Sequence, residues 1–198
     1  MGKTSIIVTL VARSGPRFVT MSALAHALRL SPRNAQAIAL QGFVLAAQNR
    51  INDALATFNE AIASDGSHGN AWLGRGLCRI RRGQNEQGRY DLLVAASLEP
   101  QRSLLRSYLG KAFAHNEEDA RGLKELDLAR SLDSHDPTPW LYSALLLQQE
   151  NRINEAIDHL EKSIDRNDNR SLFRSRLLLD QDRAVRSANL ARIYADAA

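Results

Sequence analysis

Apolar and small residues over positions 35–170 recur at spacings of three and four, the spacing of one face of an α-helix. In the first stretch, one such stripe covers Ile38–Leu45 and a second covers Ile51–Ile62. Polar residues separate the two stripes, and Asp65-Gly66-Ser67 follows the second with residues that terminate helices. No alternation of apolar and polar residues typical of strands competes with this pattern. It predicts two helices joined by a short turn.

The same helix pair recurs with a period of 34 residues. The sequence NRINDAL at Asn49–Leu55 returns as NRINEAI at Asn151–Ile157, 102 residues or three periods later, and Trp72 and Trp140 are two periods apart. A fixed period in this range marks a repeat array, in which each unit buries its apolar faces against its neighbours. Small residues expected where helices cross recur in two series: Gly42, Gly76, Gly110 and Ala144, and Ala61, Ala95, Ala129 and Ser163.

The period predicts the domain organisation of the whole chain as one continuous domain. The complete repeats are expected at 35–68, 69–102, 103–136 and 137–170, with no inserted or deleted residue between them. Residues 1–34 are expected to form a degenerate repeat whose second helix covers about 18–30, with residues 1–17 either a degenerate helix or a disordered start. Residues 171–198 are expected to form capping helices, at 171–179 and 183–194, because terminal repeats must close the open core.

This pattern resembles that of tetratricopeptide repeat (TPR) proteins, whose first helix carries W-x2-L-G-x2-Y and whose second carries A-x3-F-x2-A. The resemblance covers about residues 18–170 and implies an all-α, right-handed solenoid of antiparallel helix pairs. The matching residues are Trp72 with Gly76, Leu109-Gly110 with Phe113, Ala54 with Phe58 and Ala61, Ala156 with Leu160, and the closing prolines Pro32 and Pro100. The departures are Arg75 and Arg79 at usually apolar places, and Gly88 and Gly122 in place of alanine.

The C-terminal segment from Asn167 to Tyr194 also resembles the closing segment of some bacterial TPR proteins, including ones with FecR-like envelope-signalling domains. This narrower resemblance suggests that the chain is one portion of a longer protein. We expect a cytoplasmic location by default, and a bacterial envelope location if the chain belongs to such a longer protein.

In TPR proteins the first helices line a concave groove that holds a peptide or a partner helix. Independently of the family, Leu73, Leu77 and Ile80 form a second apolar stripe on their helix, and an apolar stripe left after packing marks an interaction surface. The alternative is that tight superhelical curvature buries this stripe. The resemblance implies a partner-binding groove formed by Asn70, Leu73, Leu77, Ile80, Arg81, Tyr108, Lys111, His115, Leu141, Tyr142 and Leu145. We expect an apolar floor with a basic or aromatic rim, suited to an amphipathic helix or a hydrophobic peptide.

Charge leaves a second class of function open. The net charge is +4, and Arg75, Arg79 and Arg82 share one helix face, where they could bind phosphates of a nucleic acid or another anionic surface. Only 6% of the residues are aromatic and no recognition motif accompanies the arginines. We therefore disfavour nucleic acid, and expect these arginines to pair with a carboxylate, Glu86, Asp91 or Glu99, because a buried guanidinium needs such a partner.

No pattern for catalysis, metal binding or a cofactor emerges. The five histidines include no i, i+4 pair, and the single cysteine, Cys78, is expected to be a small buried hydrophobe. Gly2-Lys3-Thr4 lacks the glycine, strand and loop that precede it in a phosphate-binding loop. No run of about 18 apolar residues predicts a transmembrane helix. The sequence therefore predicts a noncatalytic scaffold that binds a protein or peptide, without cofactor or metal.

Overall fold

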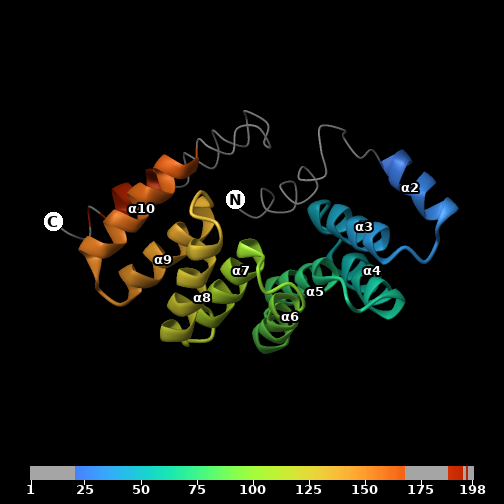
Figure 1. Ribbon diagram of the computed structural model, residues 1–198, viewed down its shortest axis with the longest axis horizontal. Coiled ribbons are helices and arrows are strands. Elements are labelled where there is room, and N and C mark those ends of the chain that lie inside the picture. Colours follow the sequence, from blue (N-terminus) through green and yellow to red (C-terminus); the bar gives the residue numbers. More distant parts are fainter. Residues whose placement is uncertain (1–20, 168–186, 194, 196–198) are drawn as a thin grey trace. The chain divides into compact units, whose positions relative to one another are not determined.

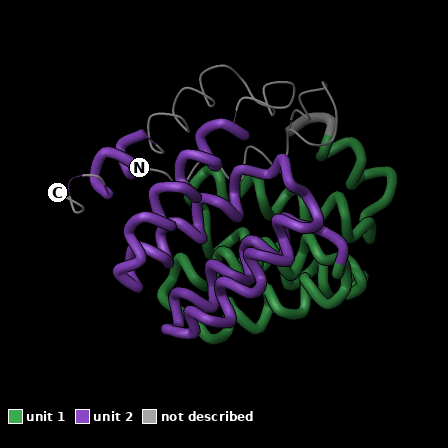
Figure 2. Tube along the Cα trace, turned by 60° about the vertical axis from the view of Figure 1, so that its left-hand side comes forward, with its two compact units in different colours: residues 1, 3–100 green, residues 2, 101–198 purple. Residues whose placement is uncertain are grey.

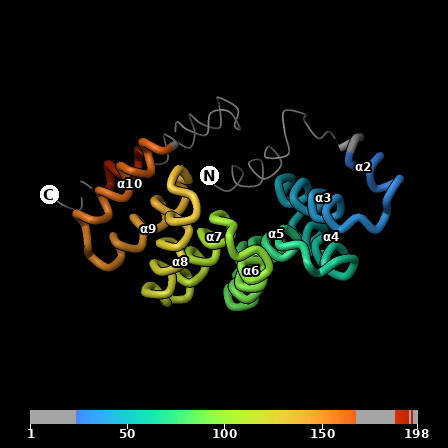
Figure 3. The backbone as a smooth tube through the Cα atoms, in the orientation of Figure 1, coloured from blue at the N-terminus to red at the C-terminus, as the bar shows by residue number. Residues whose placement is uncertain are grey.

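The computed structural model describes residues 21–167, 187–193 and 195, and every regular element among them is a helix (Figure 1). The helices follow one another as antiparallel pairs, which Figure 3 lets the reader trace from blue to red. Their bounds are α2 Met21–Leu30, α3 Ala35–Ala47, α4 Ile51–Ser64, α5 Gly69–Arg81, α6 Asn85–Leu98, α7 Ser103–Ala114, α8 Asp119–Leu132, α9 Pro137–Gln149 and α10 Ile153–Asn167. Residues 187–193 are also helical.

The helix starts keep the period of the sequence. The first helices of the four pairs begin at residues 35, 69, 103 and 137, and the second helices at 51, 85, 119 and 153. Each start is 34 residues after the previous one. The predictions for residues 1–20 and for a helix at 171–179 lie outside the described residues.

The chain divides into two compact units, one ending at Pro100 and the other beginning at Gln101 (Figure 2). The pairs α3–α4 and α5–α6 belong to the first unit, and α7–α8 and α9–α10 to the second. Nothing in the uninterrupted spacing of the repeats indicates this division.

The four turns inside the helix pairs share one backbone conformation. In each, a residue two or three positions after the end of the first helix has a positive φ. Two backbone N–H groups donate back to the last turn of that helix, which satisfies carbonyls that would otherwise be unpaired. In the first turn, Asn49 donates to the Ala46 carbonyl and Arg50 to the Leu45 carbonyl. The positive-φ residues are Asn49 (66°), Gly83 (80°), Glu117 (60°) and Asn151 (58°).

The glycines that depart from the TPR pattern have a steric reason. A Cβ on Gly88 would lie 2.8 Å from the carbonyl oxygen of Gly76, and a Cβ on Gly122 would lie 3.0 Å from that of Gly110. Such a distance is too short for a Cβ and an oxygen. The paired helices of these two repeats therefore approach each other through glycine on both sides.

Each unit has its own buried core. In the first, the fully buried ring of Phe58 meets Phe43 edge to face, with centroids 5.0 Å apart. In the second, one cluster comprises Ala144, Leu147, Ala156, Leu160 and Ile193. Ile193 belongs to the helical segment 187–193, so this segment contributes a fully buried side chain to the core of the second unit.

Candidate functional site

Charge is segregated between the two helices of every pair. The first helices α3, α5, α7 and α9 contain no aspartate or glutamate, whereas each second helix carries at least two. The basic residues of the first helices can therefore be neutralised only from other elements. The basic residues that are not neutralised leave positive charge on the surface formed by the first helices, which we call the first-helix face.

Two arginines of α5 are neutralised by one buried carboxylate on α6. Arg75 donates from Nε and Nη2 to the two oxygens of Asp91, at 3.0 and 2.8 Å, and Arg79 donates to Asp91 at 2.8 Å. The Asp91 side chain is fully buried. The predicted pairing is confirmed for Asp91, and it engages two of the three arginines that a nucleic-acid strip would need.

The remaining cations of the first helices divide into two kinds. Arg106 pairs with Glu125 at 3.0 Å. Arg81 instead donates to the side-chain oxygen of Asn49, and the Lys111 ammonium lies over the Tyr142 ring, 4.7 Å from its centroid. In the described part of the chain, Arg81 and Lys111 thus contact neutral groups rather than carboxylates.

The predicted groove residues of the first unit differ in exposure. Leu73 is fully buried and is part of the core, so a partner cannot reach it in this structure. Asn70, Leu77 and Ile80 are partly buried, and the Ile80 side chain adjoins Gly88 of the paired helix. Arg81 is exposed at the end of α5. Leu77 and Arg81 are therefore the members of this set best placed to meet a partner.

In the second unit the structure brings three of the predicted residues together. Lys111 of α7 reaches Tyr142 of α9, with 3.4 Å between Nζ and the hydroxyl oxygen, and the Tyr142 ring centroid lies 6.4 Å from that of Tyr108. Tyr108 is nearly buried, whereas Lys111 and Tyr142 are partly exposed. Together they form a cationic and aromatic cluster across the two first helices.

The other predicted residues of the second unit lie around this cluster or away from it. Leu145 is partly exposed on α9, one turn beyond Tyr142. Leu141 packs against the core cluster of the unit, and His115 is exposed at the C-terminal cap of α7. Leu145 is thus the apolar neighbour available beside the Lys111 cluster.

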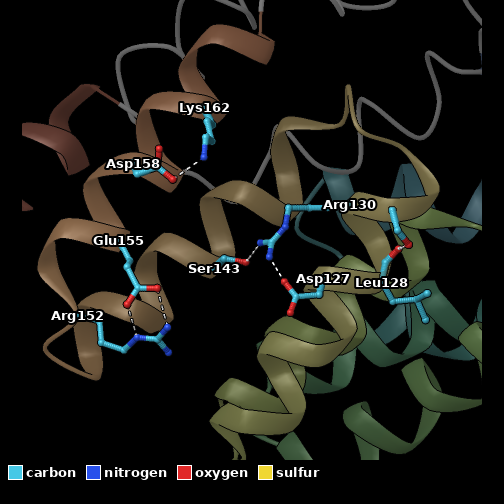
Figure 4. A network of polar contacts seen from close by, with 9 residues as sticks. Asp127, Leu128, Arg130, Ser143, Arg152, Glu155, Asp158 and Lys162 are labelled. Carbon is cyan, nitrogen blue, oxygen red and sulfur yellow. Dashed lines mark hydrogen bonds and ion pairs between the residues drawn. The ribbon is translucent and has the colours of Figure 1, made fainter.

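Sequence reasoning missed a second cluster, around Trp140 of α9. The indole lies under three cations, with its centroid 4.7 Å from Cζ of Arg130, 5.3 Å from Nζ of Lys162 and 4.6 Å from Cζ of Arg166. Figure 4 shows Arg130 between Ser143 and Asp127, and Lys162 beside Asp158. The i, i+4 spacing of Lys162 and Arg166 signalled only a basic stripe on one helix. Arg130 comes from another repeat, and only the packing of α8 on α9 brings it in.

The described residues offer little for acid–base or metal chemistry. Burial raises the pKa of the Cys78 thiol to about 11, which keeps it protonated and unreactive at neutral pH. Among these residues, no group of three histidine, cysteine or acidic side chains is placed to hold a metal ion. No helix within the described ranges is both long and apolar enough to span a bilayer.

Comparisons with known proteins agree on the fold. No protein-family profile matches the chain. Anaphase-promoting complex subunit 3 of Schizosaccharomyces pombe is 29% identical over 108 residues, which cover 54% of this chain and 16% of that protein. The chain therefore spans about a sixth of the length of this relative.

Two solved structures of low sequence identity share the architecture. The APC/C hetero-tetramer Cut9–Hcn1 superposes with a TM-score of 0.77 at 17% identity, over 98% of this chain and 34% of that chain. YrrB, described as a TPR protein with an unusual peptide-binding site, superposes with a TM-score of 0.61 at 19% identity, over 87% of this chain and 82% of its own. The bacterial type and the FecR-like association stay predictions. The chain is a helical repeat protein with the tetratricopeptide repeat fold, a solenoid of antiparallel helix pairs.

Proposed function

We propose that the chain is a noncatalytic scaffold whose first-helix faces bind a peptide or an amphipathic helix of a protein partner. The observation that carries this proposal is the charge segregation. Within the eight helices of the four pairs, every acidic residue lies on a second helix, while Arg81 and Lys111 on the first helices contact only neutral groups among the described residues. Both were expected in the groove.

The chemistry of the face in the second unit supports a partner of mixed character. Lys111 would attract an acidic side chain, because an ammonium that contacts no carboxylate among the described residues keeps its capacity for a charged hydrogen bond. Leu145 and the ring of Tyr142 would contact an apolar side chain one helical turn away. An amphipathic segment with an acidic residue next to a leucine or phenylalanine meets both requirements.

The proposal is tested by charge changes on this face. Peptides selected on the purified chain from a displayed library provide a ligand, and its Kd is then measured for Lys111→Glu and Leu145→Glu. We expect Kd to rise about tenfold or more in each, equivalent to at least ~1.4 kcal/mol. Leu128→Glu is the matched control, because Leu128 is exposed on the second helix α8.

Two results would contradict the proposal. One is unchanged Kd for both face variants when circular dichroism shows that they are folded. The other is equal weakening by the control. Leu77→Glu tests the first unit in the same way, with Leu93→Glu on α6 as its control. Random oligonucleotides titrated at increasing salt test the nucleic-acid alternative, since phosphate binding weakens steeply with salt.

A further inference from the structure

Trp140 and its surroundings differ chemically from their counterparts two repeats earlier. Trp72 is the equivalent of Trp140, and the equivalents of Arg75 and Asp91 are Ser143 and His159, each 68 residues later. Near Trp72 the arginine on the indole is neutralised by the buried carboxylate of Asp91. Near Trp140 a histidine occupies the position of that carboxylate.

Cations nevertheless gather on Trp140. Two of the three have partners whose negative charge is largely exposed: Arg130 pairs with Asp127 and Lys162 with Asp158. Arg166 donates to two backbone carbonyls, those of Ser134 at 2.9 Å and Lys162 at 3.1 Å. Within the described residues, the contacts of Arg166 therefore supply no full negative charge. Three cations therefore contact one indole, and the carboxylates paired with them among the described residues, Asp127 and Asp158, are more than half exposed.

Two further observations indicate that this place takes up a polar group. Nε1 of Trp140 and Nδ1 of His159 are buried without a hydrogen-bond partner in the described structure, and the two rings meet edge to face with centroids 5.2 Å apart. A buried polar atom without a partner is uncommon and often marks a site for an ion or water. In addition, burial and then the nearby Arg130 lower the pKa of His159 to about 4, so His159 is neutral here and adds no charge of its own at neutral pH.

We propose that Arg130, Lys162 and Arg166 around Trp140 form a binding site for a phosphate group. A guanidinium matches the oxygens of a phosphate with paired N–H donors, and an ammonium adds a point charge. The bound dianion would take the role that Asp91 has beside Trp72. The phosphate is either inorganic or carried by a phosphorylated side chain of a partner, and both present the same oxygens. This site is separate from the proposed first-helix face at Lys111 and does not depend on it.

The test uses the fluorescence of Trp140 in the full chain with Trp72→Phe, which leaves one indole. Inorganic phosphate is titrated at constant ionic strength, with chloride as the balancing anion, so that general screening does not change. We expect a saturable fluorescence change and an upward shift of the melting temperature with phosphate, because a ligand that binds the native state stabilises it. A response that is absent, or that chloride reproduces, overturns the proposal.

Three variants make the test specific. Arg166→Gln is expected to weaken phosphate binding about tenfold, and Lys162→Gln serves if that variant does not fold. Arg152→Gln is the matched control, because Arg152 is an exposed arginine of the same unit that pairs with Glu155, apart from Arg130 and Lys162 (Figure 4). His159→Asp restores a carboxylate at the position of Asp91 and is expected to abolish the phosphate response. Equal binding by the Arg166 and Arg152 variants, or an unchanged response in His159→Asp, contradicts the assignment.

A final arm distinguishes the two sources of the phosphate. A serine-containing peptide and its phosphorylated form are compared as competitors of inorganic phosphate. Competition by the phosphorylated peptide alone assigns the site to a phosphorylated partner. No competition by either, with saturable binding of inorganic phosphate, assigns it to the free anion.

Discussion

Trp72 and Trp140 occupy the same position of two repeats, yet their polar surroundings differ. The indole N–H and the stacked cation at Trp72 both have partners within the protein, whereas the indole N–H at Trp140 has none among the described residues. The Trp72 indole donates its N–H to the Gly66 carbonyl at 2.8 Å, and Arg75, which is stacked on its ring, is paired with Asp91. The Trp140 N–H has no partner in the described structure. The repeat therefore specifies where the indole lies, while a few residues around it decide whether the position is a structural contact or a site for a ligand.

The largest expected effect concerns the buried ion pairs beside Trp72. Asp91→Ala removes the carboxylate shared by Arg75 and Arg79, so that two partly buried guanidinium groups lose the negative charge that neutralises them. We expect the free energy of unfolding to fall by about 3 kcal/mol. Urea denaturation followed by circular dichroism measures the change.

The control for this prediction is an exposed ion pair near Trp140. Asp158→Ala breaks an ion pair whose carboxylate is 52% exposed, so we expect a loss of less than about 1 kcal/mol. Equal losses in the two variants would show that the buried and exposed pairs are energetically alike, which would remove the basis of the comparison.

We expect the stability of the chain to depend on pH through His159, which lies beside Trp140. The pKa of His159 is lowered to about 4, first by burial and then by Arg130, so protonation favours the unfolded chain, where the pKa is near 6.5. The contribution of this group to stability is therefore complete above pH 6.5, falls as the pH decreases below 6.5, and stops changing below about 4. We expect a loss of about 1.5 kcal/mol after allowing for solvent screening of this half-buried ring.

The measurement is the urea midpoint from pH 7.5 to 4, compared with that of His159→Gln. The variant should lose this part of the pH dependence. A parallel profile in both proteins would assign the dependence to other groups. Saturating phosphate at Trp140 is expected to reduce the effect, because a bound anion favours the protonated ring.

The smallest expected effect concerns the turns of the same two repeats. Gly83 and Asn151 both have a positive φ, which glycine adopts freely and asparagine tolerates. Gly83→Ala is expected to lower the free energy of unfolding by about 1 kcal/mol, and Gly83→Asn, which copies the other repeat, by about half as much. Equal urea midpoints for the alanine variant and the unmodified chain would contradict the shared turn conformation.

Much of the fold could be predicted from the spacing of residues, whereas the sites could be predicted only in part. The in-phase recurrence of small residues such as Gly76 and Gly110 predicted where paired helices approach, because a Cβ at either glycine would lie only 2.9 Å from a facing carbonyl oxygen. The same pattern did not separate Leu73, which is fully buried, from the partly exposed Leu77 one turn later. Both are leucines of one apolar stripe, and the neighbouring helices decide which of them is covered.

The sequence alone determined the helix pairs and their 34-residue period, and it indicated that the α5 arginines pair with a carboxylate, because helical periodicity and the charge of a buried group act through local spacing and simple complementarity. The structure selected Asp91 among the three candidates, Glu86, Asp91 and Glu99. The tertiary structure decided which cations contact no carboxylate and which residues from different repeats meet. Lys111 reaches Tyr142 across 31 positions, and Arg130 joins Lys162 and Arg166 at Trp140 from another repeat. Such contacts depend on how the helices pack against one another, and the residue pattern of a single helix does not determine this packing.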